Sequence, residues 1–255
     1  MAAFSDIITG FIELQGGITF MQMGLNLMAA IHPPTYIHSV MVAKIATCLT
    51  RHIIARHPEL FVGCQGCTTK EEVVQNKETF LEFVYNAGLC HDFGKLVIID
   101  TIYVYGRNLL DMEQEIISTH AAMGGELLSR HESTKDYVNV AVGHHRWYDG
   151  SKGYPMSFDI INSPCRTSTS IVCCADCMDT ATDKIGRSYN DGIELEDYIK
   201  EVKEGAGTRY APYMAEILEV PEVVEDMKYL LTEGRKKVYR DTYRLLSRVH
   251  VDARF

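Results

Sequence analysis

Basic residues are outnumbered in this sequence of 255 residues, which has 25 Lys and Arg against 34 Asp and Glu and a formal net charge of −9. A protein whose main task is to grip a nucleic-acid backbone needs a positive surface, so we expect no nucleic-acid polymer as its partner. A phosphate ligand must then be met locally, by metal ions or a few placed cations. With 46% hydrophobic residues, the chain is long enough to bury one sizeable core.

The sequence also lacks an unbroken apolar run at its N-terminus. Four polar residues interrupt that segment: Asp6, Glu13, Gln15 and Asn26. We therefore predict neither a signal peptide nor a membrane span in this chain. The eight cysteines are irregularly spaced, and Cys173 and Cys174 lie in an apolar run, which favours reduced thiols over a disulfide scaffold. These features predict a cytoplasmic protein.

Repeats and low-complexity tracts are absent, and the apolar spacing is overwhelmingly helical, so we predict an all-α fold. Helices are expected over residues 4–14, 18–31, 35–57, 69–90, 111–132, 134–145, 166–183, 194–204, 210–218, 221–231 and 233–247. Between residues 146 and 165 lies a loop rich in Gly, Pro and Ser, and long loops in compact domains are often functional. We divide the chain into an N-terminal helical extension, residues 1–33, and a main domain, residues 34–255.

The pair His91-Asp92 falls at the predicted end of a helix, where two neighbouring side chains can converge on one cleft. The pair alone is weak support for a site, because a His at a helix C-terminus beside a solvated Asp is an ordinary alternative. Further candidate ligands follow along the chain: His120, His144, His145 and Asp176. Imidazole and carboxylate donors together suit Fe, Mn, Zn or Ni. Their number exceeds what one ion requires, which predicts a two-metal site acting on phosphoryl groups.

These residues belong to an ordered series of motifs. The series comprises His91-Asp92-Phe93-Gly94-Lys95, His120, His144-His145, Asp149-Gly150, Gly153-Tyr154-Pro155, Ala175-Asp176 with Asp179, and Gly207-Thr208-Arg209-Tyr210-Ala211-Pro212. It resembles the HD-GYP family of HD-domain metal-dependent phosphohydrolases, over roughly residues 35–218. Each motif alone carries little weight, whereas their common order and compatible spacing make the resemblance specific.

The resemblance implies an HD-domain helical bundle that holds two divalent metal ions. One ion would be held by His38, His91, Asp92 and Asp176, and the second by Asp92, His120, His144 and His145. His38 enters because the family places an early ligand in a His-x-x-x-Val pattern, which His38 and Val42 match; a buried or capping His is the alternative. We expect Fe or Mn, with Zn, Ni and Mg as alternatives.

The same resemblance implies contacts with the substrate. Lys95 is expected to act in catalysis by reaching a non-bridging phosphate oxygen, and Tyr154 to lie near the substrate's phosphate or base. The ordinary alternatives are an exposed lysine at a helix end and an ordinary surface turn. Where the family carries an Arg-Pro-Tyr-Arg element, this chain has Gly186-Arg187-Ser188-Tyr189, which makes Arg187 the best substitute for a phosphate contact.

Two further departures from the family pattern bear on the site. Members with three metals carry a Glu four residues before the early His, and Pro34 stands there in this chain, so we expect no third ion. The interval between Asp149-Gly150 and Gly153-Tyr154-Pro155 carries one extra residue, Lys152. These changes leave the reaction type better defined than the substrate.

The resemblance implies hydrolysis of cyclic di-GMP to the linear dinucleotide pGpG, through attack by a metal-bridging hydroxide. Further hydrolysis to GMP is an open alternative. Cyclic GMP-AMP is the alternative cyclic dinucleotide. Two other readings stay open: a degenerate HD-GYP module that binds a nucleotide or a partner protein without turnover, and a general HD-type nucleotide phosphohydrolase. A sensory partner domain and a homodimer formed through residues 1–31 are further expectations.

Several residues with ligand chemistry fall outside this pattern. Two C-x-x-C pairs, Cys64-Cys67 and Cys174-Cys177, lie too far apart in the sequence to suggest one site, and we interpret the second as packing. A structural metal at the first pair is the minor alternative. The remaining histidines are interpreted as structural or exposed: His32, His52, His57, His131 and His250.

Overall fold

The computed structural model describes residues 19–98, 109–186 and 191–252, with side chains up to residue 247. These residues form helices and connecting loops and no β-strand, which confirms the all-α prediction. The α-helices are α2 (Phe20–Ile31), α3 (Pro33–Arg56), α4 (Lys70–Gln75), α5 (Lys77–Cys90), α7 (Asp111–Ser118), α8 (His120–Ser129), α9 (Val138–Gly143), α10 (Arg166–Thr182), α11 (Leu195–Glu204), α12 (Pro212–Ile217), α13 (Pro221–Tyr229) and α14 (Arg235–Asp252). Short 3₁₀ turns cover Pro58–Phe61, Phe93–Val97 and Lys135–Tyr137, and a π-helical turn covers Leu230–Gly234.

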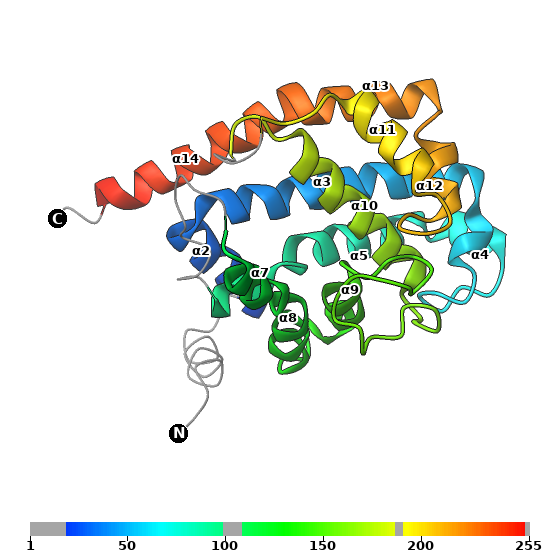
Figure 1. Ribbon diagram of the computed structural model, residues 1–255, viewed down its shortest axis with the longest axis horizontal. Helices are drawn as coiled ribbons and strands as arrows, with labels where there is room; N and C mark the ends of the chain where they lie inside the picture. The colour runs from blue at the N-terminus through cyan, green and yellow to red at the C-terminus, as the bar shows by residue number, and fades with distance from the viewer. Residues whose placement is uncertain (1–18, 99–108, 187–190, 253–255) are drawn as a thin grey trace.

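Helix α3 runs through the middle of the bundle, with α5 on one side, α14 on the other and α10 crossing it (Figure 1). Its first two residues, Pro33 and Pro34, are tolerated because the first turn of a helix needs no backbone donor. The His32 side chain caps the helix by accepting from the Thr35 backbone N–H at 3.3 Å. Because α3 is buried along most of its length, it forms the centre of the core, and His38 near its start lies against that core.

Helix α2 covers the turn that carries His91 and Asp92. Met28 is fully buried in a small apolar cluster with Phe93 and Leu128. A Cβ atom at Gly24 would lie 2.6 Å from the Phe93 ring, so glycine permits α2 to approach this turn closely. Residues 20–31 therefore help to position the motif, while a domain boundary at residue 33 stays a prediction.

The helices predicted within the described residues are found, but polar side chains divide two of them. Thr69 begins α4 with the expected capping box, since it accepts from the Glu72 N–H and the Glu72 carboxylate accepts from the Thr69 N–H. The predicted helix 69–90 is interrupted at Asn76, whose side-chain Nδ2 donates to the Glu72 backbone carbonyl at 2.9 Å. Thr119 divides the predicted helix 111–132 in the same way, by donating to the Ile116 carbonyl.

Near the C-terminus, two helices that were predicted as separate are joined. The sequence predicts two helices, 221–231 and 233–247, whereas the π-helical turn joins α13 and α14 without a break. The predicted helix 4–14 lies outside the described residues.

The cysteines and the apolar helices can be described directly. All eight cysteines lie in the described part of the chain and none forms a disulfide. None of the described helices combines the length and apolarity that a bilayer crossing requires. A cytoplasmic location stays a prediction.

Candidate metal centre

The structure brings the seven predicted ligand side chains into one cluster at the ends of several helices. They are His38 in α3, His91 at the end of α5, Asp92 before the following 3₁₀ turn, His120 at the start of α8, His144 and His145 directly after α9, and Asp176 in α10. All are buried except the half-buried His145. Buried polar groups need partners, so the way these side chains pair decides what the cluster can bind.

Asp92 lies at the centre of the cluster, and its two oxygens face different histidines. Its Oδ1 is 3.2 Å from His120 Nε2 and 3.9 Å from His144 Nε2. Its Oδ2 is 3.5 Å from His91 Nε2 and 3.6 Å from His38 Nε2. A carboxylate in this position can serve two neighbouring cations at once.

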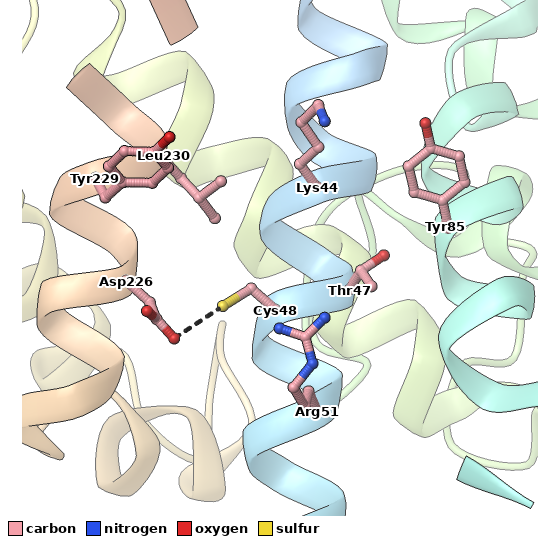
Figure 2. A pocket seen from close by; sticks show the side chains of 8 residues that line it. All are labelled: Lys44, Thr47, Cys48, Arg51, Tyr85, Asp226, Tyr229 and Leu230. Atoms are coloured by element: carbon pink, nitrogen blue, oxygen red, sulfur yellow. Dashed lines mark hydrogen bonds between the residues drawn. The ribbon is translucent and has the colours of Figure 1, made fainter. Parts of the chain in front are cut away.

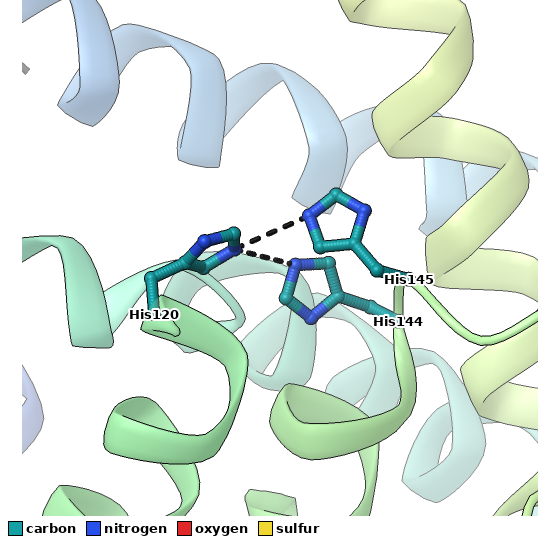
Figure 3. Close-up of side chains that lie close together, drawn as sticks. All are labelled: His120, His144 and His145. Atoms are coloured by element: carbon teal, nitrogen blue, oxygen red, sulfur yellow. Dashed lines mark hydrogen bonds between the residues drawn. The ribbon is translucent and has the colours of Figure 1, made fainter. Parts of the chain in front are cut away.

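His120 faces His144 and His145 (Figure 3), and these histidines lie on the Oδ1 side of Asp92. The His120 Nε2 atom lies 3.2 Å from the Nε2 atoms of both neighbours. The Nδ1 atoms of His120 and His144 donate to the backbone carbonyls of Ile117 and Ala141, at 2.6 and 2.7 Å. In a neutral imidazole the other nitrogen then carries a lone pair. These two lone pairs point at each other, an arrangement that a shared cation resolves.

On the other side of Asp92, the rings of His91 and His38 are also held through their Nδ1 atoms. The Nδ1 atom of His91 donates to the Gly88 carbonyl, and the Nδ1 atom of His38 lies against Asp179 Oδ2, both at 2.7 Å. Metal-binding histidines almost always hold their second nitrogen in this way. Among the described residues, His38 Nε2, His91 Nε2 and Asp92 Oδ1 have no hydrogen bond of acceptable geometry. The donor set therefore fits divalent cations.

Asp176 completes the cluster on the side of His38. Its Oδ1 lies 3.0 Å from His38 Nε2, and its Oδ2 lies 3.8 Å from His145 Nδ1. Three overlapping groups have ligand atoms within 4.8 Å of one another: His38 with His91 and Asp176, His120 with His144 and His145, and His91 with Asp92 and His144. The cluster thus has two halves that meet at Asp92.

Electrostatics keep most of these donors in the protonation states that metal binding requires. Burial alone would raise the pKa of Asp92, but the Lys95 ammonium and the nearby histidines outweigh it and hold the pKa well below its usual range. Burial lowers the pKa of His145 to about 3, and burial together with the neighbouring histidines holds the pKa of His144 well below its usual range. His38 differs, because burial would lower its pKa but the adjacent carboxylates of Asp176 and Asp179 outweigh burial and raise the pKa to about 9. An ion at His38 must therefore displace a proton.

Two motif glycines allow backbone segments to meet at the cluster. A Cβ atom at Gly94 would lie 1.8 Å from the His120 carbonyl oxygen, and one at Gly153 would lie 1.9 Å from the His145 carbonyl oxygen. Gly153 also has a φ of 86°, which side-chain-bearing residues rarely adopt. The glycines of both motifs are thus explained by close packing against the two segments that carry His120 and His145.

The predicted substrate contacts lie at the edge of the cluster. Lys95 Nζ is 2.5 Å from Asp92 Oδ2, and its side chain is 19% exposed, so it reaches from solvent to the buried carboxylate. The Tyr154 ring lies 4.5 Å from the His145 ring, measured between centroids. Burial, reinforced by the carboxylates of Asp176 and Asp92, raises the pKa of the Tyr154 hydroxyl. Arg187, the third predicted contact, lies outside the described residues.

The loop that carries Tyr154 is fixed by its neighbours. The Arg146 guanidinium donates to the carbonyls of Gly150 and Lys152. The late motif around Arg209 holds the other end, because the Tyr148 N–H donates to the Arg209 carbonyl at 3.2 Å. The extra residue, Lys152, places its ammonium over the Trp147 ring, 4.8 Å from the centroid. It therefore lengthens the loop without entering the cluster.

Sequence reasoning missed Arg235, the first residue of α14. This arginine is 3% exposed and donates to Asp179 Oδ1 at 2.8 Å, while Asp179 Oδ2 holds His38. It also donates to the Thr182 carbonyl at 2.8 Å. Arg235 therefore positions His38 through Asp179. Because it stands 56 residues from its partner and matches no motif, the sequence gives no signal for it.

Arg235→Met is expected to lower the free energy of unfolding by about 3–5 kcal/mol, because it leaves the buried Asp179 carboxylate without its cation. Metal affinity should also fall by about 10–100-fold, since His38 loses its support. Urea denaturation and metal titration measure the two effects. Arg240→Met, at an exposed position of the same helix, is the control and should change neither. Equal stability of the two variants would contradict this role.

The comparisons with known proteins agree with this arrangement. Residues 35–191 match the HD domain family. The chain is 32% identical to a cyclic di-GMP phosphodiesterase of Thermotoga maritima over 63% of this chain and 42% of that protein. It is 32% identical to the 3'3'-cGAMP-specific phosphodiesterase 2 of Vibrio cholerae, over 55% of this chain and 26% of that protein. It is also 31% identical to the cyclic di-GMP phosphodiesterase response regulator RpfG of Xanthomonas campestris, over 40% of this chain and 27% of that protein.

The chain thus spans less than half the length of each of these relatives. HD-domain phosphohydrolases depend on metal ions, and the clustered histidines and aspartates are suitable ligands. The family match covers more than half of the chain, and the relatives support the resemblance inferred from the motifs. This chain belongs to the HD domain family, within its HD-GYP branch.

Proposed function

We propose that this protein is a metal-dependent phosphodiesterase that hydrolyses a cyclic dinucleotide, with cyclic di-GMP as the first candidate. The observation that carries the proposal is the pair of buried donor groups that meet at the two oxygens of Asp92. Similarity to relatives named for cyclic di-GMP and 3'3'-cGAMP supports the substrate class. Cyclic GMP-AMP is therefore the alternative substrate.

The two halves of the cluster suggest how two ions would be held. His38, His91, Asp92 and Asp176 would hold one, and Asp92, His120, His144 and His145 the other. Two divalent ions at such a site supply a nucleophile derived from water and neutralise charge on the phosphoryl oxygens. Fe or Mn is the first choice for these nitrogen and oxygen donors. Pro34, one turn before His38, offers no ligand atom for a third ion.

Lys95 and Tyr154 are proposed to bind the phosphodiester. The Lys95 ammonium is poised at Asp92 and exposed enough to contact a non-bridging phosphate oxygen, where it would stabilise developing negative charge. The raised pKa of Tyr154 keeps its hydroxyl protonated, so that it can donate to the phosphate. Arg187 is proposed as a further phosphate contact.

Two rival functions make different demands on the same cluster. A module that only binds a nucleotide or a protein has no use for seven converging ligands, four of them histidines whose second nitrogens are held by carbonyls or Asp179. A general nucleotide phosphohydrolase would use the metal cluster but has no need of the loop that brings Tyr154 against His145. A sensory partner domain and a homodimer stay predictions.

A substrate panel separates these functions. Protein purified anaerobically and supplied with Mn²⁺ or Fe²⁺ is assayed against cyclic di-GMP, cyclic GMP-AMP and nucleotide monoesters. We expect hydrolysis of a cyclic dinucleotide by the wild type and by His57→Ala, whose histidine is paired with surface glutamates, and none by His91→Ala. Binding of the cyclic dinucleotide without turnover would favour the receptor, and turnover of monoesters alone the general phosphohydrolase.

Tyr154→Phe is expected to lower kcat/KM for the cyclic dinucleotide by about 10-fold or more, because a hydrogen bond to a charged group contributes roughly 1.5–3 kcal/mol. Bound metal should stay unchanged, since Tyr154 is not among the proposed ligands. Steady-state kinetics with metal analysis tests both points. Tyr243→Phe, at an exposed position of α14, serves as the control. A Tyr154→Phe enzyme with wild-type kcat/KM would remove Tyr154 from substrate binding.

A further inference from the structure

A trough with a volume of about 360 Å³ runs along α3, between α5 and α13 (Figure 2). Its lining residues are Lys44, Thr47, Cys48, Arg51, Tyr85, Asp226, Tyr229 and Leu230. None of them belongs to the metal centre described above. The trough is therefore a separate feature of the surface, which neither the motifs nor the proposed reaction explain.

Three side chains with ligand chemistry lie together here: Cys48 and Asp226 line the trough, and His52 contacts Asp226 beside it. Cys48 and His52 are four residues apart on α3, a spacing that places them on the same face of a helix. Asp226 approaches them from α13, and Figure 2 shows its carboxylate facing the Cys48 thiol. Asp226 Oδ2 lies 2.8 Å from His52 Nε2 and 3.6 Å from Cys48 Sγ. The ligand atoms of all three residues lie within 4.8 Å of one another.

We propose that Cys48, His52 and Asp226 form a second metal site, selective for Zn²⁺ or a similar borderline-soft divalent ion. One sulfur, one nitrogen and one oxygen donor form a set that zinc accepts in tetrahedral sites. The thiolate and the carboxylate together balance the charge of the ion. Three protein ligands leave the fourth coordination position of a tetrahedral ion free, and the adjacent trough has space for a further ligand there.

The metal-free arrangement is compatible with this use. Burial and Asp226 raise the pKa of the Cys48 thiol to about 12, so the thiol is protonated and donates to the carboxylate until an ion displaces its proton. His52 must carry its own proton on Nδ1 to bind the ion through Nε2. Arg56 Nη1 lies 3.3 Å from His52 Nδ1 and also donates to the His52 carbonyl, while Arg56 Nη2 donates to the Glu222 carboxylate. The guanidinium therefore keeps acceptors when His52 Nδ1 is protonated.

Occupation of this site would join α13 to α3, the helix that also carries His38. The two metal sites differ in one chemical respect, because the donors of the HD centre are nitrogen and oxygen alone. Of the two sites, the trough alone offers a sulfur donor, the Cys48 side chain. Soft ions should therefore distinguish the trough from the HD centre, and a signal from a metal–sulfur bond reports on the trough without interference from the other site.

The test uses Co²⁺ as a spectroscopic probe in the full chain. Metal-free protein is titrated with Co²⁺, and the ultraviolet charge-transfer absorption of a cobalt–thiolate bond is recorded. We expect this band in the wild type, its loss in Cys48→Ser, and its loss or strong reduction in His52→Ala and Asp226→Asn. Added Zn²⁺ should displace the cobalt and abolish the band. Circular dichroism of each variant establishes that it is folded.

Cys64→Ser and Cys67→Ser are the matched controls, because these cysteines form one of the two C-x-x-C pairs and do not line the trough. Both should keep the band. A wild type without the band, or a band that survives in Cys48→Ser, would overturn the proposal. Loss of the band in Cys64→Ser or Cys67→Ser alone would assign the metal to that pair instead. His52 and Asp226 lie toward the surface, with side chains 15% and 52% exposed, so their variants test the site even if Cys48→Ser fails to fold.

Discussion

Asp92→Asn is expected to reduce hydrolysis of the cyclic dinucleotide by at least about 10³-fold. The substitution keeps the shape of the side chain but removes its charge and one of the two oxygens that face the separate histidine groups. Two metal ions on a phosphoryl group stabilise the transition state by several kcal/mol. Each loss of about 1.4 kcal/mol of this stabilisation slows the reaction tenfold. Single-turnover kinetics with excess metal measures the loss.

The matched control for Asp92→Asn is Asp136→Asn, because Asp136 is exposed and remote from the cluster. It should retain wild-type activity and metal content. Asp92→Asn should in addition bind fewer ions than the wild type. An Asp92→Asn enzyme that keeps its activity and its metal would show that the two halves of the cluster do not depend on a carboxylate bridge.

Lys95→Met is expected to lower kcat by about 10²–10³-fold, the loss typical of removing one preorganised charge donor at a reacting oxyanion. Bound metal should be retained, because an ammonium group is not a metal ligand. Lys95→Arg should recover part of the activity, since it restores the charge with a different geometry. Metal analysis alongside kcat and KM distinguishes this role from a purely structural one.

The control for Lys95→Met is Lys135→Met, at an exposed position that is ion-paired with Glu132. We expect it to be indistinguishable from the wild type. If Lys95→Met instead loses metal and keeps normal turnover when metal is in excess, then Lys95 serves to hold Asp92 and does not contact the phosphate.

The sequence identified the side chains that the fold brings together because they occupy motif positions in a fixed order. His91, His120 and His144 lie at or next to helix ends, and ends are where segments far apart in the sequence can meet. The motif glycines are needed for the same arrangement, because Gly94 and Gly153 pack against the backbone of the ligand-bearing segments. Local spacing therefore contained most of the information about the site.

The features that the sequence did not predict depend on contacts between distant segments or on single side chains. Asn76 and Thr119 end helices by hydrogen bonds to the preceding turn, in stretches whose apolar periodicity continues. Arg235 supports the site from the C-terminal helix. His52 was interpreted as structural or exposed because its partner, Asp226, lies 174 residues later. Only the folded arrangement brings such pairs together.

The proposed two-ion centre is tested most directly by titrating metal-free protein with Mn²⁺ under anaerobic conditions while bound ions and hydrolysis of cyclic di-GMP are measured together. Mn²⁺ favours oxygen and nitrogen donors, so it should fill the HD centre in preference to the thiolate site. We predict that activity appears with the second ion and reaches its maximum at two ions per chain. Full activity with one ion, or hydrolysis that persists in fully metal-free protein, would contradict a two-metal phosphodiesterase centred on Asp92.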